Sequence, residues 1–321
     1  MLLLRNFIAA LKQGAKITPD DLAGMIGLPH VGNLFYIDPT NGNDTANSGS
    51  MQDDAFKTMF TAEAATTNVN HDVVIVTPGG TAGTSETQTV TWNNSYTHLI
   101  GNTAPAMISQ RSRIVSTTDS VDPCFVFSGQ GCMIKNIQLA TYQASNDVLT
   151  SLTNNRNVFA NVHFAGIGHE TAGDDTTARS LVLTAAEENV FSNCVIGLDT
   201  VARSVANAEI EFASAATRNI FEDCRINQFA DNAGHLAVTI GLGGIDRFVE
   251  FKNCLFFNPL DSTATGMTVM MSIHASAGGS VILSGMTQQY GATDWANDFT
   301  NLLVGGPVPT GATSNFLIQG A

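Results

Sequence analysis

Large apolar residues return at the same place in five short segments of the chain, each time two residues before an Asn or Asp. In each segment the order is large apolar, variable, Asn or Asp, small apolar, variable, apolar. The steps between successive Asn/Asp positions are 25, 32, 30 and 30 residues. This spacing predicts a structural repeat of roughly thirty residues. The five Asn/Asp positions are Asn136, Asn161, Asn193, Asp223 and Asn253.

The alternation of inward and outward side chains is interrupted at each Asn or Asp. Side chains of a straight strand alternate between two faces with period two, so one unbroken strand does not fit this pattern. Asn and Asp adopt left-handed backbone dihedrals more readily than other residues that carry a side chain. We therefore predict a strand, a bend at the Asn or Asp, and a second strand, with the Asn and Asp side chains stacked in a ladder. The large apolar residues should form one buried stack, which comprises Phe159, Phe191, Phe221 and Phe251.

A further apolar stretch precedes each bend, for example at residues 181–183, 210–212 and 238–240. Several short strands per repeat, with like residues above one another, describe a parallel β-helix. Successive coils of such a helix lie about 4.8 Å apart, so residues of one column touch. The stretches 73–76, 97–100 and 113–116 fit the first, less regular coils.

The residues before the repeat resemble a known family. Residues 36–44 (Tyr-Ile-Asp-Pro-Thr-Asn-Gly-Asn-Asp), followed by Gly49 and 55–58, resemble the entry motif of right-handed, pectate-lyase-like β-helices. Residues 72–79 and 98–101 resemble the first coil of those proteins. The resemblance implies an all-β fold, a right-handed single-stranded parallel β-helix, for which we predict about seven or eight coils. This scaffold carries polysaccharide lyases, hydrolases and non-enzymatic phage virion proteins alike. The low content of charged residues, with many Asn, Thr and Gly, is most similar to the phage proteins of this family. Because those phage proteins usually form trimers, the resemblance implies a homotrimer.

The two ends of the chain depart from the repeat. Within residues 1–34, apolar residues recur at helical spacing, and Thr18-Pro19 is a good start for a second helix. This segment either caps the open end of the β-helix or docks on another virion protein. We predict a helical segment over 1–34, a β-helix over 35–285, and a cap or extended tail over 286–321. The expected attachment residues are Leu4, Phe7, Ile8 and Leu11.

Charge narrows the range of partners. Only 13% of residues are charged, and 28 acidic against 14 basic residues give a net charge of −14. A surface this negative repels phosphate backbones and anionic lipid, which argues against a nucleic-acid partner. No apolar stretch reaches the roughly 18–20 residues that span a bilayer, so no membrane insertion is expected. Arg5 interrupts the apolar start, so we expect no signal peptide and a protein made in the host cytoplasm.

The sequence offers no clear cofactor or catalytic group. The five cysteines lack CxxC spacing, so neither a disulfide framework nor a zinc site is indicated. Inverting hydrolysis of a polysaccharide needs two carboxyl groups about 6.5–9.5 Å apart. Asp223 stands in the Asn column, where a structural role is expected. Glu209 and Glu211 flank Ile210 with no acid in the adjacent rows, so we interpret them as a solvated face.

One loop is dense in oxygen and imidazole ligands. It contains His169, Glu170, Asp174 and Asp175. Such a loop is a weak candidate for Ca²⁺, which prefers several carboxylates and carbonyls. It lacks the spaced pattern of a dedicated calcium loop, so a polar surface loop is the favoured interpretation.

These observations lead to two functional hypotheses. The first is a non-enzymatic bacteriophage virion protein, a capsid decoration or a head or tail appendage, attached through its N-terminal segment to other virion proteins. The second is a tailspike-type depolymerase that binds and cleaves host surface polysaccharide. A cell-surface adhesin is a further possibility. A depolymerase needs paired acids on neighbouring coils, whereas a structural protein needs only shape, rigidity and an attachment site.

Overall fold

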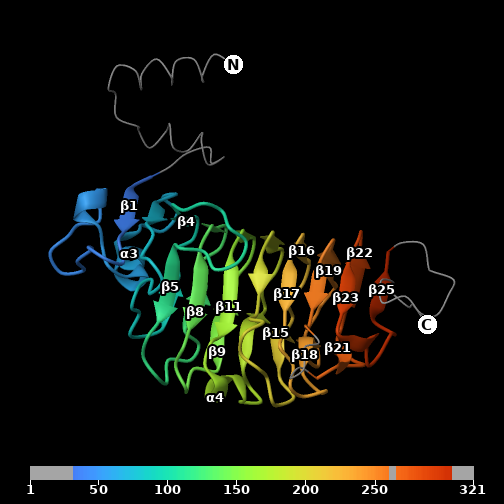
Figure 1. Ribbon diagram of the computed structural model, residues 1–321. Coiled ribbons are helices and arrows are strands. Elements are labelled where there is room, and N and C mark those ends of the chain that lie inside the picture. The colour runs from blue at the N-terminus through green and yellow to red at the C-terminus, as the bar shows by residue number, and fades with distance from the viewer. Residues whose placement is uncertain (1–31, 260–264, 306–321) are drawn as a thin grey trace.

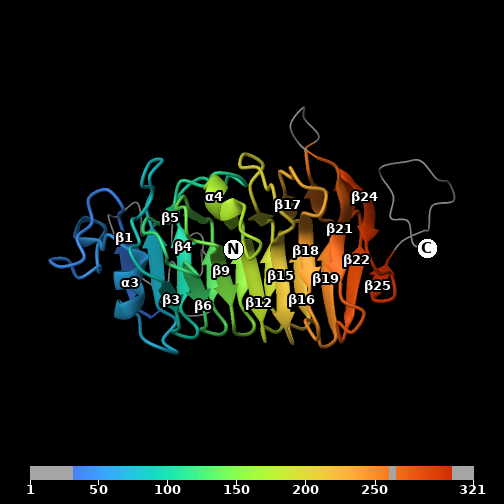
Figure 2. The ribbon, with the colours of Figure 1, turned by 90° about the horizontal axis from the view of Figure 1, so that it is seen from below.

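The computed structural model describes residues 32–259 and 265–305, which form three parallel sheets wound into one elongated body. Figures 1 and 2 show the strands following one another along the long axis, from β1 at one end to β25 at the other. The attachment residues predicted at Leu4, Phe7, Ile8 and Leu11 lie outside the described residues. No helix in the described part of the chain is long and apolar enough to cross a membrane.

Every strand pairs in parallel with the equivalent strand of the next coil. The ten-strand sheet contains β1 (Leu34–Ile37), β2 (Val73–Val76), β4 (His98–Gly101), β7 (Met133–Lys135), β10 (Val158–Ala160), β13 (Val190–Ser192), β16 (Asn219–Glu222), β19 (Phe248–Lys252), β22 (Ser280–Ser284) and β25 (Leu302–Val304). The seven-strand sheet contains β5 (Arg113–Ser116), β8 (Gln138–Thr141), β11 (His163–Ile167), β14 (Val195–Ile196), β17 (Arg225–Asn227), β20 (Leu255–Phe257) and β23 (Gln288–Tyr290). The eight-strand sheet contains β3 (Val90–Trp92), β6 (Phe125–Phe127), β9 (Val148–Leu152), β12 (Arg179–Thr184), β15 (Ala208–Ser214), β18 (Leu236–Ile240), β21 (Met267–Ile273) and β24 (Ala292–Ala296).

The order of the sheets confirms the predicted fold class, an all-β, right-handed parallel β-helix. From β4 to β24 the chain visits the ten-, seven- and eight-strand sheets in the same order seven times. The protein therefore has seven complete coils, in agreement with the prediction of about seven or eight. Incomplete coils add β1, β2 and β3 at one end and β25 at the other.

The bend between the first two strands of a coil lies at the Asn or Asp. Asn136, Asn161, Asn193, Asp223 and Asn253 have φ values between 53° and 55°. This left-handed conformation turns the chain sharply from the ten-strand sheet into the seven-strand sheet, and Asn and Asp tolerate it best among residues with a side chain. Along this column Asn161 Nδ2 donates to Asn136 Oδ1 at 2.9 Å.

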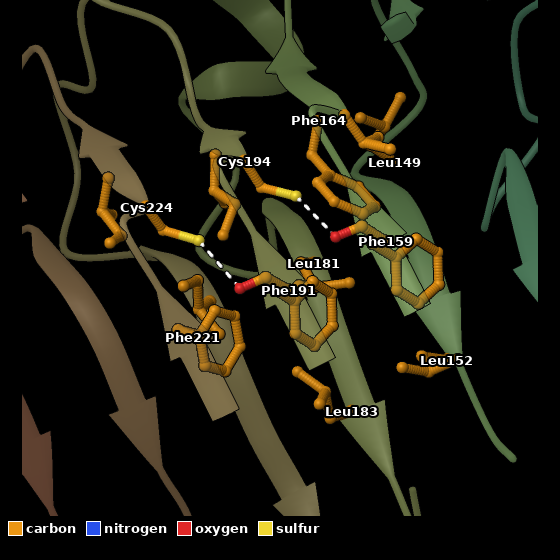
Figure 3. Close-up of a cluster of buried hydrophobic side chains, with 14 of the residues drawn as sticks. Leu149, Leu152, Phe159, Phe164, Leu181, Leu183, Phe191, Cys194, Phe221 and Cys224 are labelled. Atoms are coloured by element: carbon orange, nitrogen blue, oxygen red, sulfur yellow. Dashed lines mark hydrogen bonds between the residues drawn. The ribbon is translucent and has the colours of Figure 1, made fainter. Parts of the chain in front are cut away.

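The interior of the coils is filled by stacked side chains. The rings of Phe159, Phe191, Phe221 and Phe251 are fully buried, with centroids 4.9, 4.3 and 4.8 Å apart along the stack. Beside them the Cys194 and Cys224 thiols donate to the Phe159 and Phe191 carbonyls, both at 3.3 Å (Figure 3). A buried thiol that has a carbonyl acceptor behaves as a small core hydrophobe. Burial raises the pKa of the Cys224 thiol well above its ordinary value, because the thiolate loses its hydration.

A second ladder of asparagines, which was not predicted from the sequence, joins neighbouring coils by hydrogen bonds. Its members lie two residues before the stacked phenylalanines in the sequence. Asn157 Oδ1 accepts the Cys132 N–H at 2.8 Å, Asn189 Oδ1 accepts the Asn157 N–H at 2.9 Å, and Asn219 Oδ1 accepts the Asn189 N–H at 3.1 Å. All three side chains are buried, so each bond satisfies a backbone donor that water does not reach. The signal was present in the sequence, because these asparagines repeat with the phenylalanines.

The N-terminal end of the core is covered by helix α3 (Met59–Ala65), which packs beside β1 and β3 (Figure 2). Met59 and Ala62 are fully buried in the core. Glu86 accepts the N–H groups of Met59 and Phe60 at 2.8 and 3.2 Å and so caps the helix start. Two shorter helical turns, Gln52–Asp54 and α4 (Glu170–Gly173), lie on loops. Within the described residues, helix α3 thus covers the N-terminal end of the core.

The C-terminal boundary predicted at residue 285 is wrong. The strands β23, β24 and β25 continue all three sheets as far as Val304. Trp295 in β24 is 4% exposed and packs edge-on against Phe256, with centroids 5.4 Å apart. The last coil lacks the repeated Phe and Asn residues. Its strands form by parallel pairing with the strands of the preceding coil.

The outer faces of the sheets differ in exposure. On the ten-strand sheet, Val158, Val190 and Ile220 point outward and remain at least partly exposed. On the seven-strand sheet, Val195 is fully buried, although it stands at a variable, outward position of the repeat. His163 and Gln138 of the same column are 1% and 3% exposed. Leu255, farther along this sheet, is partly exposed.

Candidate functional site

A buried polar cluster lies where the chain passes from the seven-strand sheet into the eight-strand sheet. Glu209, on β15, is fully buried, so its interpretation as part of a solvated face is wrong. Its Oε1 lies 3.2 Å from Nε of Arg203, which is itself 3% exposed at the side chain, and its Oε2 accepts a hydrogen bond from Ser180 Oγ on β12. Glu211, two residues on, is partly exposed and pairs with Arg179 at 2.6 Å.

Hydrogen bonds to Asn207 determine the protonation of His235 in this cluster. Asn207 Nδ2 donates to the carbonyls of Gly173 and Asp175 at 2.7 and 2.9 Å, so its Oδ1 faces His235 Nδ1 at 2.7 Å. An amide oxygen only accepts, and Nδ1 must therefore carry the proton. Burial and the charges of Arg203 and Arg179 lower the pKa of His235 to about 3, so the ring is neutral at pH 7.

His235 Nε2 is consequently a bare acceptor, and it lies 3.8 Å from Glu209 Oε1, another acceptor. Arg203 Nη1 has no hydrogen-bond partner among the described residues. A carboxylate, a guanidinium, a neutral imidazole and a hydroxyl are the groups of acid–base chemistry. Here, however, Glu209, Arg203 and His235 are all nearly inaccessible to solvent, so no polymer chain reaches them. The arrangement instead ties the loops 168–178 and 197–207 to the sheet.

The four residues of the loop that was a weak candidate for Ca²⁺ do not converge on one point. His169 Nδ1 accepts the Thr171 N–H at the start of α4, and Asp174 Oδ1 accepts the Ser204 N–H at 2.9 Å. Asp175 accepts the N–H and hydroxyl of Thr177, which lower the pKa of its carboxyl, and Glu170 points to solvent as an exposed residue. Within residues 32–259 and 265–305, no group of three or more His, Cys, Asp or Glu side chains is placed to hold a metal ion.

Carboxylates on the outer face of the ten-strand sheet are held by a partner on a neighbouring coil. Glu222 pairs with Lys252 at 2.7 Å, and Glu250 accepts from Ser284 Oγ at 2.6 Å. Just before the strands of this sheet, Glu188 lies between two arginines, 2.8 Å from Arg156 and 2.7 Å from Arg218. Asp223, the acid that the sequence singled out by position, is a bend residue with φ 55°.

Two further surface features lie toward the C-terminal end. The Arg225 guanidinium sits 4.7 Å from the centre of the Phe257 ring, and Phe257 stacks on Tyr290 with centroids 5.6 Å apart. An open hollow of about 550 Å³ beside β18 and β21 is lined by Ser272, His274 and Asp298 among others. Asp298 is the one carboxylate among its lining residues, whereas glycoside hydrolysis uses two.

Comparisons with known proteins bear on the fold. No protein-family model matches the sequence, and no curated protein does. Among solved structures, a pectin methylesterase variant in complex with a hexasaccharide matches with a TM-score of 0.55 and 12% identity, covering 89% of this chain and 92% of that one. Pectin methylesterase PemA from Erwinia chrysanthemi matches with a TM-score of 0.52, at the same identity and coverage. A product of Geobacillus virus E2, ORF18, matches with a TM-score of 0.48 and 10% identity over 85% of this chain and 55% of that one.

At these identities the likeness concerns the backbone. It shows that the chain shares the parallel β-helix of the pectin methylesterases over most of its length. The same scaffold supports unrelated functions, so the chemistry must be argued from this chain's own side chains.

Proposed function

We propose that this chain is a non-enzymatic structural protein of a bacteriophage virion, a capsid decoration or a head or tail appendage. The observation that carries the proposal is that the acids on and beside the outer face of the ten-strand sheet have partners on adjacent coils. Glu188, Glu222 and Glu250 each have a cation or a hydroxyl of an adjacent coil as partner. Acids used in this way cross-link the coils of a rigid rod, as the buried Asn157 ladder does inside it.

The surroundings of these acids do not favour a general acid. A glycosidase acid is kept protonated near neutral pH by burial in an apolar pocket or by a neighbouring carboxylate. Glu222 instead forms an ion pair with the Lys252 ammonium group at 2.7 Å, and its hydrogen bond and charge raise the pKa of that ammonium group. The cluster that has the groups of acid–base chemistry, around Glu209, is closed to solvent.

The test is the place and number of copies of the chain in an intact phage particle, by mass spectrometry and cryo-electron microscopy. A copy number of the chain equal to that of the capsid lattice sites supports a capsid decoration protein. A few copies located at the tail support a tail appendage. Absence from purified particles contradicts the proposal. Substitution of Phe7 and Leu11 by Asp tests attachment, because the variant protein should fold but fail to enter particles.

A tailspike-type depolymerase is the second candidate. It is favoured by the backbone likeness to pectin methylesterases and by the ladder of partly exposed Arg225 and Phe257 and exposed Tyr290, since aromatic and guanidinium faces suit a sugar chain. Purified chain incubated with host capsule or lipopolysaccharide would then release shortened oligosaccharides. Glu222→Gln and Glu250→Gln should each lower that release by at least about a hundredfold if these partly exposed acids do the chemistry.

A further inference from the structure

The loop between β4 and β5 leaves its own coil and lies over the coils that follow. Its residues 104–109 are all exposed. Gln138 on β8 and His163 on β11, which point outward from the next two coils, are by contrast 3% and 1% exposed. We name this loop, residues 102–111, the flap.

Two hydrogen bonds hold the flap on the later coils. The Ser109 N–H donates to His163 Nδ1 at 3.2 Å, and Gln110 Nε2 donates to the Asn161 carbonyl at 3.4 Å. The second bond is long for an N–H donor, so the first is the stronger attachment. Other hydrogen bonds of the flap lie inside it or join it to its own and the preceding coil, as from the Gly79 N–H to the Arg111 carbonyl at 3.3 Å.

The bond to Ser109 determines where a proton can add to His163. Nδ1 accepts the Ser109 N–H and therefore carries no hydrogen, which leaves Nε2 as the protonated nitrogen of the neutral ring. Nε2 faces the Gly197 carbonyl at 3.4 Å, so it donates there. A second proton can add only at Nδ1, where it would meet the N–H of Ser109. Protonation of the ring thus replaces the attachment of the flap by two opposed donors.

The backbone of Ser109 gives the flap a reason to leave once that bond is lost. Ser109 has a φ of 55°, in the left-handed region that residues with a side chain seldom occupy. Such a conformation persists where the surroundings hold it in place. The His163 ring is the hydrogen-bond acceptor that holds this N–H, so its protonation leaves the strained residue without that support.

The groups around His163 keep the ring neutral as long as the flap is closed. Burial lowers the pKa of His163 to about 4, and the charge of Arg113 on β5 lowers it as well, whereas the Gly197 carbonyl and the carboxylate of Asp199 act in the opposite direction. The flap itself carries Arg111, and the in-register neighbours of the ring in the sheet are an uncharged glutamine and a valine. The two arginines keep their charge throughout the acid range, so the change of charge is that of the imidazole.

We propose that residues 102–111 form an acid-released flap, which is latched by the Ser109–His163 hydrogen bond and opens when His163 takes up a proton at Nδ1. Opening exposes the outer face of β8 and β11. That face continues in register into Arg225 and Leu255, which are already partly exposed. The inference goes beyond the proposed function and does not depend on it, because it concerns the purified chain.

The test is amide hydrogen exchange of the full chain at pH 7 and pH 4.5, corrected for the pH dependence of the chemical exchange rate. A ring with a pKa of about 4 in the closed state and near 6.5 in the open state raises the ratio of open to closed flap about fiftyfold between these pH values. The protection factor of the Ser109 amide should fall by that factor. The Asn189 amide, which bonds Asn219 Oδ1 inside the coils, should remain far better protected at both pH values.

Two substitutions of the latch separate its acceptor from its titration. His163→Gln keeps an acceptor oxygen but does not titrate, so the protection of Ser109 should change less than about threefold between pH 7 and pH 4.5. His163→Leu offers neither, and Ser109 should exchange quickly at both. His274→Gln is the matched control, because His274 is an exposed imidazole on another sheet, and it should retain the fiftyfold change.

Three results would overturn the proposal. The first is a wild-type Ser109 amide that is equally protected at pH 7 and pH 4.5, and the second is a fiftyfold change that survives in His163→Gln. The third is an Asn189 amide that loses protection together with Ser109, because the coils themselves then open. Circular dichroism and thermal unfolding at pH 7 check that each variant folds, and if His163→Leu does not, His163→Gln alone decides.

Discussion

Outward residues of the ten-strand sheet, such as Val190 and Ile220, are partly exposed, whereas the corresponding residues His163 and Val195 of the seven-strand sheet are buried. Both sets belong to columns of the same coils and point away from the core. The open surface, defined as the outer face of the ten-strand sheet, meets solvent directly. The covered surface, defined by Gln138, His163, Val195 and Glu209, lies beneath loops that the coils send across it.

Hydrogen bonds show how one such loop is held. The Ser109 N–H donates to His163 Nδ1 at 3.2 Å, and Gln110 Nε2 donates to the Asn161 carbonyl at 3.4 Å. These contacts join residues 51 to 54 positions apart in the chain, and they exclude water from the sheet below. The same residue type should therefore contribute differently to the free energy of unfolding on the two surfaces. The following substitutions measure that difference.

The largest contrast is expected for a glutamate paired with arginine on the covered surface. Glu209→Gln leaves the Arg203 guanidinium buried without its carboxylate, and an uncompensated buried charge costs about 3–5 kcal/mol. Urea unfolding at pH 7 should show that loss. A loss below about 1 kcal/mol would mean that water reaches the cluster and that the surface is not closed.

The second contrast is the pH dependence of the covered surface. Burial lowers the pKa of His163 from 6.5 to about 4, while the unfolded chain takes up a proton near 6.5. The stability that the neutral ring contributes is complete above pH 6.5 and is lost as the pH falls toward 4, a loss of roughly 3 kcal/mol. Thermal unfolding at pH 7 and pH 4.5 should show it.

The buried rings of His98 and His235 change stability in the same direction, since their pKa values are lowered to about 4 and about 3. His163→Gln should therefore remove only part of the acid sensitivity. His274→Gln, at an exposed residue, is the control and should retain all of it. An unchanged pH profile in His163→Gln would count against a closed environment for this ring.

A smaller contrast is expected between two valines of one coil. Val195→Ala removes two methyl groups from a fully buried position, which should cost about 2 kcal/mol. Val190→Ala, on the open surface, should cost less than about 1 kcal/mol when measured on dilute protein. Equal losses in the two variants would show that Val190 is covered in solution even at low concentration.

The smallest effect is expected for a glutamate paired with arginine beside the open surface. Glu188→Gln weakens two ion pairs at once, but the Arg156, Glu188 and Arg218 side chains are 61%, 32% and 38% exposed. Exposed ion pairs are each worth about 0–1 kcal/mol, so the variant should unfold within about 1 kcal/mol of wild type. High salt should reduce even this difference, while leaving that of Glu209→Gln largely unchanged.

The sequence by itself was enough to predict the coil. Phe191 and Asn193 repeat with Phe221 and Asp223, and each pair describes a local event, an inward side chain followed by a left-handed bend. Such events depend on neighbours along the chain and on the identical residue one coil away, so a single sequence displays them. The last coil was missed because Trp295 and Leu302 follow no repeat, and only pairing with β21 and β22 places them.

Only the tertiary structure decided which outward residues meet water. Period-two alternation distinguishes the two faces of a strand, but it has no information on a loop that crosses one face from elsewhere in the chain. Glu209 was therefore interpreted as solvated, although Arg203 and His235 enclose it from loops and strands 6 and 26 residues away in the sequence. Ile220, with the same alternation, has no such cover among the described residues. The difference arises because burial depends on what packs from outside, and irregular loops carry no period from which that packing can be read.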